Sequence, residues 1–278
     1  MTQHDHDNGL AHDLDMLADF AARRRALLKW GLGLGALPLL ACAGSNMDST
    51  DMTSTDAAAG AGTDTNTTNG TCSTVPEETA GPYPGDGTNG ANALALTGIV
   101  RSDITTSIAG ASGVAEGVPL TVTLTIVDGS KGCTPLAGYA VYIWHCDRGG
   151  NYSMYSAAAA SENYLRGVQE TDANGTVTFT TISPACYSGR WPHIHFEVYP
   201  SLDMASSGAN KVATSQLALP ASNCDDVFAT DGYAASVANF GQISLDSDMV
   251  FSDGADLETP TVTGNVAAGF VAKLSVAI

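Results

Sequence analysis

The sequence has few histidines and few basic residues, and each shortage limits what the protein can do. Its 278 residues include six His, and 11 Lys and Arg stand against 29 Asp and Glu, for a formal net charge of −18. A surface this acidic is poorly suited to nucleic acid or to an anionic membrane face. The apolar run near the N-terminus is short for a membrane span. No repeat of fixed period is present.

The N-terminal segment has the features of an export signal. "RRRALLKWGLGLGALPLLACAG" begins at Arg23 and joins arginines to a short apolar run, which is typical of a signal peptide. Its Arg24-Arg25 pair resembles a twin-arginine signal, and "LLAC" resembles a lipobox with Cys42 as the lipidated residue. A plain signal peptide is the alternative, and translation starting at Met16 is another. We expect residues 1–42 to act as the signal segment, which is removed on export, with Cys42 retained as the lipid anchor. The protein would then be periplasmic or at the cell surface.

The composition changes twice after this segment. Residues 43–71 are rich in Ser, Thr, Asp, Gly and Ala and contain no aromatic residue, Lys or Arg. Such a stretch cannot bury enough surface to fold, so it predicts a disordered tether. Residues 72–278 are expected to form the folded domain.

The folded region is predicted to be all-β. Short alternating apolar segments follow one another, and turn residues separate them. "DANG" at 172–175 indicates a hairpin before "TVTFTTI". The best helix candidate is the short Ala stretch at 157–160. We therefore expect a two-sheet antiparallel β-sandwich with long loops and little helix. The expected strands are "ALALTGIV", "PLTVTLTIVD", "YAVYIWHCD", "GTVTFTTI", "HIHFEVYP", "SQLALP" and "FVAKLSVAI".

The cysteines suit an oxidising compartment. Five follow Cys42, so at least one stays free or pairs between chains. Cys72 and Cys224 are plausible disulfide partners, and Cys146, on a predicted core strand, is the best candidate for a free thiol. The sequence does not fix the connectivity.

The pattern "HIHFEVY" places His193 and His195 on one face of a strand, opposite its apolar face. Two imidazoles on one face can share a metal, although two surface histidines by chance are the alternative. After residue 42 only His145 remains besides this pair. The site of a copper-zinc dismutase, which needs about half a dozen histidines, is therefore excluded. A cupin site also needs another His and a Glu at its own spacing, and both are absent.

Two tyrosines complete a different donor set. Tyr187 lies in a loop just before the pair, and Tyr152 follows the strand "YAVYIWHCD". Phenolate oxygen is a hard anionic donor, so two phenolates with two imidazoles suit Fe(III) better than Zn(II) or Cu(I). A ferric ion would also lower the phenol pKa.

Several segments together resemble the intradiol ring-cleavage dioxygenases, in their secreted, twin-arginine-exported branch. The resemblance covers roughly residues 72–256, and its most specific part is the order Tyr, Tyr, Arg-x-x-His-x-His. It rests on "ETAGPYPGDG", "YAVYIWHCDRGGNYSMYS", "NYLRGVQETDANGTVTFTTISPACYSGRWPHIHFEVY" and "TSQLALP".

The resemblance implies a single non-haem Fe(III) and a role for each matching residue. Tyr187 would be the axial tyrosinate that leaves when substrate chelates, and Arg190 would lie beside the bound ring. Gln216 would lie near the iron, and Gly81, Pro82 and Tyr83 would wall the substrate pocket. The implied reaction cleaves a catechol with O2 to a muconate-type diacid. The implied iron ligands are Tyr152, Tyr187, His193 and His195.

Some residues depart from the pattern or stay ambiguous. Trp191 either packs over the substrate ring or simply covers the site. His145 and Asp147 are interpreted as structural, and Glu197 as a solvated strand residue. Four of the 11 basic residues precede Cys42, and of the remaining seven only Arg190 is placed in the pocket by motif, which favours a neutral catechol or hydroxyquinol. The family resemblance leaves a homo-oligomer open.

Two other functions remain on the sequence alone. A catalytically inactive sandwich could bind aromatics or metal, and a structural surface lipoprotein would hold no metal. Iron content separates the lipoprotein from the other two, and catechol turnover separates the enzyme from the binding module.

Overall fold

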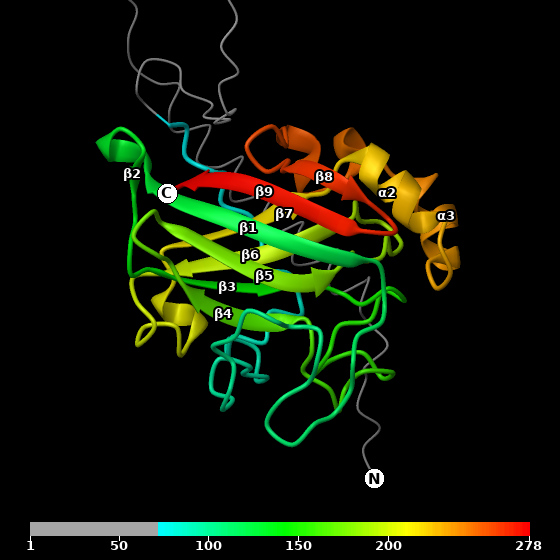
Figure 1. Ribbon diagram of the computed structural model, residues 1–278, viewed down its shortest axis with the longest axis horizontal. Coiled ribbons are helices and arrows are strands. Elements are labelled where there is room, and N and C mark those ends of the chain that lie inside the picture. Colours follow the sequence, from blue (N-terminus) through cyan, green and yellow to red (C-terminus); the bar gives the residue numbers. More distant parts are fainter. Residues whose placement is uncertain (1–71) are drawn as a thin grey trace, which may run out of the picture. The chain divides into compact units, whose positions relative to one another are not determined.

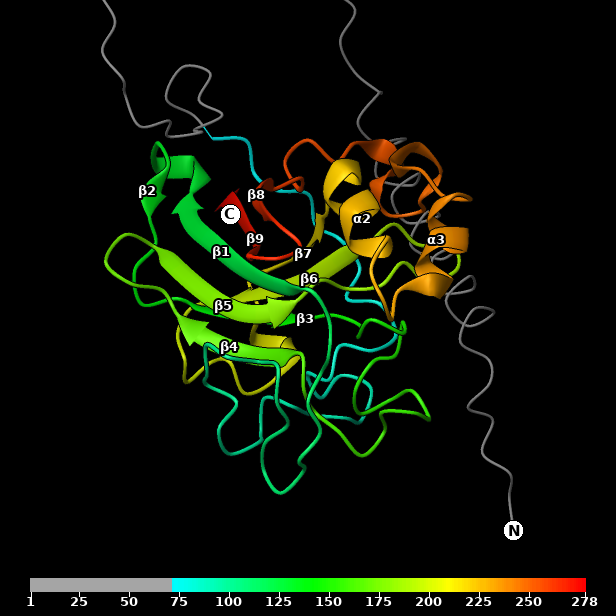
Figure 2. The ribbon, with the colours of Figure 1, turned by 45° about the vertical axis from the view of Figure 1, so that its right-hand side comes forward.

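The computed structural model describes residues 72–278, which form a sandwich of two β-sheets (Figures 1 and 2). In these residues the five-stranded sheet has the order β2-β1-β9-β8, with β5 paired to the same edge of β1 as β2, and the four-stranded sheet has the order β4-β3-β6-β7. The predicted sandwich is confirmed. The strands are β1 Pro119–Asp128, β2 Thr134–Pro135, β3 Ala140–Trp144, β4 Arg166–Glu170, β5 Thr176–Ile182, β6 His193–Tyr199, β7 Ala213–Ala218, β8 Thr261–Asn265 and β9 Gly269–Ala277.

Two features of the sheets differ from the prediction. The strand pairs are antiparallel except β1 with β9, which run parallel. The "DANG" turn does not close a hairpin, because β4 pairs with β3 whereas β5 pairs with β1. Asp172 accepts the N–H groups of Asn174 and Thr176, and Gly175 has φ +74°. The turn is as tight as predicted, but it carries the chain from one sheet to the other.

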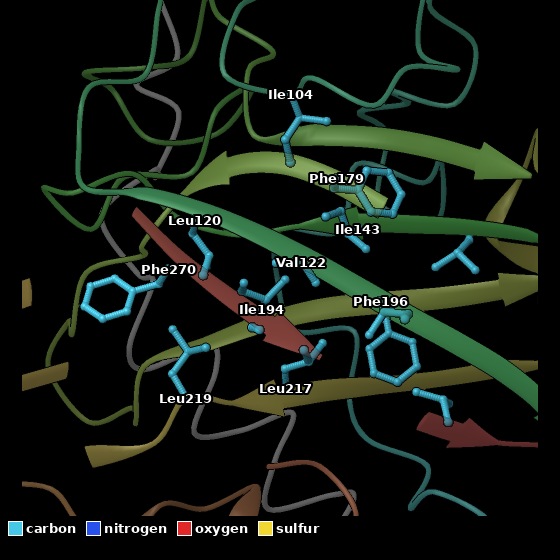
Figure 3. Packing of buried hydrophobic residues seen from close by; sticks show 14 of the residues in the cluster. Ile104, Leu120, Val122, Ile143, Phe179, Ile194, Phe196, Leu217, Leu219 and Phe270 are labelled. Carbon is cyan, nitrogen blue, oxygen red and sulfur yellow. The ribbon is translucent and has the colours of Figure 1, made fainter. Parts of the chain in front are cut away.

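The core lies between the sheets and follows the alternation of the strands. In β1, Leu120, Val122, Leu124 and Ile126 are buried, and the threonines between them point outward. Figure 3 shows Leu120 and Val122 of β1 and Phe270 of β9 facing Ile194 and Phe196 of β6, with Leu217 of β7 beside them. This contact between sheets is the main source of stability, because it removes large apolar side chains from water.

The helical segments are short and were not anticipated. Helices α2 (Ala221–Phe228) and α3 (Ala234–Phe240) gather at one end of the sandwich (Figure 2). Residues 157–160 form turns, so that helix prediction was wrong, as was the strand predicted over 93–100, where turns bury Leu94 and Ile99. Among the described residues, no helix is long and apolar enough to span a membrane.

The N-terminal part of the domain runs from one sheet to the other. A disulfide joins Cys72 to Cys133, and Val75 N–H then bonds to the carbonyl of Ala277 in β9. Glu78 N–H bonds to the carbonyl of Thr214 at the edge of β7. Cys72 therefore forms a disulfide as expected, whereas the expectation of a disulfide at Cys224 was wrong, and the free thiol expected at Cys146 is confirmed. The free cysteines of the described part, all buried, are Cys146, Cys186 and Cys224.

Candidate metal centre

Strand β6 places both histidines on the face of its sheet that points away from the core. His193 and His195 alternate with Ile194, which packs into the core. The His195 ring stacks on Trp144 of β3, with ring centroids 4.7 Å apart and planes within 4°. Nδ1 of His193 lies 2.5 Å from the carbonyl oxygen of Trp191. Because that carbonyl can only accept, Nδ1 carries the proton and Nε2 presents its lone pair.

The two tyrosines come from loops on either side of this strand in sequence. Tyr152 lies in the loop after β3, where its N–H bonds to Ser156 Oγ at 2.9 Å. Tyr187 lies in the loop before β6. The loops approach closely, since a Cβ added at Gly150, where φ is +86°, would lie 3.3 Å from Cβ of Tyr187. A side chain at this position would therefore be strained and would press on Tyr187.

Three donor atoms converge on one point. Tyr152 Oη and Tyr187 Oη are 3.4 Å apart, and each is 3.2 Å from His193 Nε2. The His195 ring lies beside them, with its centroid 4.8 Å from that of His193. Metal bonds of about 2 Å hold neighbouring donors about 3 Å apart, so this triangle has the size of a coordination sphere.

The protonation of these groups suits a cation of high charge. Burial, followed by the positive charge of Arg190, lowers the pKa of both His193 and His195 well below the usual value, which keeps their nitrogens neutral. Burial, followed by the charge of Tyr187, raises the pKa of Tyr152 well above 10, so its phenolate forms only when a cation compensates it. No group of three or more His, Cys, Asp or Glu in residues 72–278 offers another metal site. The donor set of two phenols and two imidazoles therefore fits ferric iron.

Arg190 sits at the edge of this donor set and is nearly buried. Its Nη1 lies 3.4 Å from His193 Nε2, and its Nη2 donates to Gln216 Oε1 at 2.7 Å. Its Nε donates to Asp248 Oδ2 at 3.0 Å. Gln216 in turn donates through Nε2 to the carbonyl of Thr79 at 2.9 Å. The structure thus brings Arg190 and Gln216 to the histidines, and Gln216 acts by linking the guanidinium to the N-terminal segment.

The N-terminal segment passes directly over the site. A Cβ at Gly81, where φ is +67°, would lie 3.4 Å from Cε1 of His195. Tyr83 packs on Tyr152 with ring centroids 5.0 Å apart and on Tyr155 at 5.3 Å. Pro82 accepts a bond from Asn89 Nδ2 at 2.7 Å. The structure therefore brings Gly81 and Tyr83 close to predicted metal ligands, and Pro82 lies between them in the chain.

The chain is similar to known dioxygenases in sequence and in fold. The model of a family described as Dioxygenase matches residues 100–227. The intradiol ring-cleavage dioxygenase of Tetranychus urticae is 27% identical, with a TM-score of 0.58 over 74% of this chain and 95% of that one. A second dioxygenase structure gives the same identity and TM-score and covers 94% of that chain. Over these residues in sequence, and in its fold, the chain is similar to the intradiol ring-cleavage dioxygenases. A search of the curated proteins finds no significant match.

The family match does not cover the whole candidate site. It includes the four predicted ligands, Arg190 and Gln216, but it begins after Tyr83 and ends before Asp248. The segments that close the site from both ends of the domain therefore lie outside the matched range.

Trp191 lies next to the site but faces away from the donor atoms. Its indole N–H bonds to the Leu219 carbonyl at 2.8 Å, and its ring lies 4.8 Å from Phe240. It belongs to a small apolar cluster with Ala218 and Phe251, among others. Of the two alternatives for Trp191, this placement favours a covering role, and its carbonyl holds His193.

Glu197 does not behave as the sequence predicted. It is 0% exposed, with Oε1 2.7 Å from Lys211 Nζ and Oε2 accepting the Tyr199 hydroxyl at 2.6 Å. The prediction of a solvated residue was wrong because this face of β6 is covered. His145 is buried between Thr181 Oγ1, at 2.7 Å, and the Cys146 carbonyl, which agrees with a structural role.

Two residues that organise the site were not predicted from the sequence. Arg166 of β4 is buried and donates to the carbonyls of Tyr83, Pro84 and Ser153, so it ties the N-terminal segment to the loop that carries Tyr152. Asp248 holds Arg190. The only signal for Arg166 was its place in "NYLRGVQ". Asp248 carried none, because its role depends on a contact across 58 positions.

Proposed function

We propose that this protein is a mononuclear non-haem Fe(III) dioxygenase that cleaves a catechol-type diol between its hydroxylated carbons, using O2, to a muconate-type diacid. The observation that carries the proposal is the convergence of Tyr152 Oη, Tyr187 Oη and His193 Nε2 within 3.4 Å of one another. His195 would be the fourth protein ligand. A bound ferric ion would supply the Lewis acidity that binds both catechol oxygens and makes the ring reactive toward O2.

The two tyrosines differ in how firmly they are held. Tyr152 is buried, its backbone is bonded to Ser156, and its ring packs on Tyr83. Tyr187 is half-buried and is followed directly by the exposed residues Ser188 and Gly189. Tyr187 is therefore the phenolate that can swing away when a catechol binds, and its Oη can take one of the two protons that the diol releases. Tyr152 keeps its place throughout.

Arg190 supplies a fixed positive charge beside the reacting ring. Its guanidinium is held on Nε and Nη2, which leaves Nη1 directed toward the donor set. A cation that is already oriented costs no reorganisation when negative charge builds on the substrate carbon. The planar fork of Arg suits this task better than the flexible ammonium of Lys.

The charges around the site favour a neutral diol over a carboxylated one. Arg190 is already bound to Asp248 and Gln216, and Arg166 is bound to backbone carbonyls. A ring carboxylate would need one of these cations to leave its partners. We therefore propose a neutral catechol or hydroxyquinol as substrate.

Export is a separate part of the proposal. The twin-arginine sequence and Cys42 lie outside the described residues, as does the tether over 43–71. The Cys72–Cys133 disulfide supports an oxidising compartment, which a twin-arginine exported protein reaches after folding. We propose that the enzyme acts outside the cytoplasm, anchored by a lipid on Cys42.

The direct test is turnover of catechol under ¹⁸O2 by the purified, iron-loaded protein. The expected product is a muconate-type diacid that carries both ¹⁸O atoms. His145→Gln is the matched control, because it removes a buried histidine outside the donor set and should keep the activity. A protein that binds one iron yet leaves catechol unchanged would instead be a binding module, and a protein that binds no iron would contradict the assignment of the ligands.

A further inference from the structure

Asp248 is a fully buried acid that belongs to none of the sequence motifs. It lies between two short 3₁₀ turns, Leu245–Ser247 and Phe251–Asp253, and is 0% exposed. It also lies beyond residue 227, where the family match ends. Burying a carboxylate costs free energy unless it is paired with a positive charge and hydrogen-bonded. The partners of the Asp248 carboxylate therefore indicate its role.

Both oxygens of Asp248 are occupied by N–H donors. Oδ1 accepts from the backbone N–H groups of Val250 and Phe251, at 2.8 and 3.2 Å. Oδ2 accepts from Arg190 Nε at 3.0 Å and from the backbone N–H of Trp191 at 2.6 Å. The hydrogen bonds to Oδ1 hold the carboxylate in place within its own loop. Oδ2 is therefore a rigidly positioned acceptor for Arg190 and Trp191.

Two paths lead from this fixed point to the metal ligands. The first runs through the Arg190 guanidinium, whose Nη1 lies 3.4 Å from His193 Nε2. The second runs through the Trp191 peptide group. The Trp191 N–H donates to Asp248, and the Trp191 carbonyl accepts the Nδ1–H of His193, with an N···O distance of 2.5 Å. One carboxylate therefore orients both the cation beside the substrate and the ring of a ligand.

We propose that Asp248 is a positioning residue of the active site, which holds the Arg190 charge toward the substrate ring and directs the His193 lone pair at the metal. This inference rests on the proposed function. It extends the site to a segment that neither the motif nor the family match includes.

The physical reason is that Arg190 has three anchors of unequal strength. Gln216 is a neutral acceptor and His193 is a distant contact, whereas Asp248 forms a buried charge-assisted bond. Charge-assisted bonds are roughly twice as strong as neutral ones. Without the negative charge, the guanidinium would keep Gln216 but could rotate about that bond. Its Nη1 would then no longer be held at one place beside the ring.

The first test uses Asp248→Asn, which keeps the shape and removes the charge. Changes behind a metal ligand cost about 10–100-fold in affinity or activity. We expect kcat for catechol to fall by about that factor with KM nearly unchanged, because Arg190 acts on charge that develops during the reaction. We also expect the iron dissociation constant, measured by chelator competition, to rise about 10-fold because His193 is less well oriented.

A double-mutant cycle separates positioning from a general structural effect. In an Arg190→Gln background, and with the protein saturated with iron, Asp248→Asn should lower kcat by less than about twofold further, because the guanidinium is gone and the path through Trp191 to His193 acts on iron affinity. Factors that multiply would overturn the inference. Glu197→Gln is the control, since it also breaks a buried acid's ion pair, with Lys211 at 2.7 Å, and should change neither kcat nor iron affinity.

Two further outcomes keep the inference open to refutation. If Asp248→Asn does not fold, Asp248→Glu retains the charge but displaces it. It should lower kcat at least about fivefold with a normal iron content, and an unchanged kcat would overturn the proposal. If the wild-type protein shows no turnover, the proposed function fails. The comparison of iron affinity between Asp248→Asn and Glu197→Gln then decides this inference alone.

Discussion

Strands of both sheets show the same residue alternation, but the outer faces of the two sheets differ in burial. In β1 of the five-stranded sheet, buried Leu and Val alternate with Thr121, Thr123 and Thr125, which lie at or near the surface. In β6 of the four-stranded sheet, "HIHFEVY" alternates just as regularly, yet all seven residues are buried. The outer face of β6 is therefore a second interior, built from polar groups.

This second interior is covered by segments from far along the chain. Tyr83 and Pro84 of the N-terminal segment lie over it through their bonds to Arg166, and Lys211 reaches Glu197. Because water is excluded, each polar group needs a partner in the protein. The five-stranded sheet needs no such cover. A polar strand face is therefore exposed to solvent only if no other segment of the chain packs over it.

The largest expected contrast is between neighbours on opposite faces of β6. His193→Gln removes a predicted iron ligand and should lower kcat by more than about 100-fold, since even changes behind a ligand cost 10–100-fold. Ile194→Val, one position along on the core face, should keep kcat and lower the free energy of unfolding by about 1 kcal/mol. Steady-state kinetics and urea unfolding of both variants check this. Equal losses of activity would break the distinction between the two faces.

The second contrast removes one cation from the outer face of each sheet. Arg166→Met should lower the free energy of unfolding by about 4 kcal/mol, because several buried carbonyls lose their donor. Lys273→Met in β9 replaces an exposed residue and should change it by less than about 0.5 kcal/mol. Chemical denaturation measures both. A mild effect of Arg166→Met would mean that water or other donors reach the covered face.

The third prediction concerns the bond between the sheets, from His145, which follows β3, to Thr181 of β5. Burial lowers the pKa of His145 to about 4. Between pH 6.5 and 4, His145 is therefore protonated in the unfolded chain but stays neutral in the folded protein. The free energy of unfolding consequently falls as the pH falls. Over this window the wild type should lose about 3 kcal/mol more than His145→Gln. Unfolding curves at pH 7 and 4 test it, and parallel losses in both proteins would show that His145 titrates normally.

The smallest effect is expected on the exposed face of β5. Thr178 is exposed, and its Oγ1 lies 3.3 Å from that of Thr123. Thr178→Val should change the free energy of unfolding by less than about 0.5 kcal/mol, because water replaces the lost hydroxyl contact. Thermal unfolding is sufficient to check it. A large loss would show that this face, too, is covered, for instance by a second copy of the chain.

The sequence predicted those parts that depend on local pattern or on a compact motif. Strand alternation located β1, β5, β6 and β9, and the motif located Tyr152, Tyr187 and the His193–His195 pair, whose donor atoms or rings meet in the structure. Each of these features is determined by residues that lie close together in the sequence.

The parts that escaped prediction depend on contacts between distant segments. Glu197 was predicted to be solvent-exposed because no residue near it in sequence indicates that Lys211 and the N-terminal segment cover it. Helix α2 owes its stability to Cys224, Val227 and Phe228, which pack into the core, rather than to a strong helical pattern. The "DANG" turn shows the same limit, since the turn type is local but its sheet partners are not.

The central claim is that Tyr152, Tyr187, His193 and His195 hold one ferric ion at a site open to a catechol. The most direct measurement is the visible absorption spectrum of the ferric-loaded protein, recorded before and after anaerobic addition of catechol. We expect a broad tyrosinate-to-Fe(III) band that shifts when catechol binds and that weakens in Tyr152→Phe. A protein that stays colourless after ferric loading would contradict it.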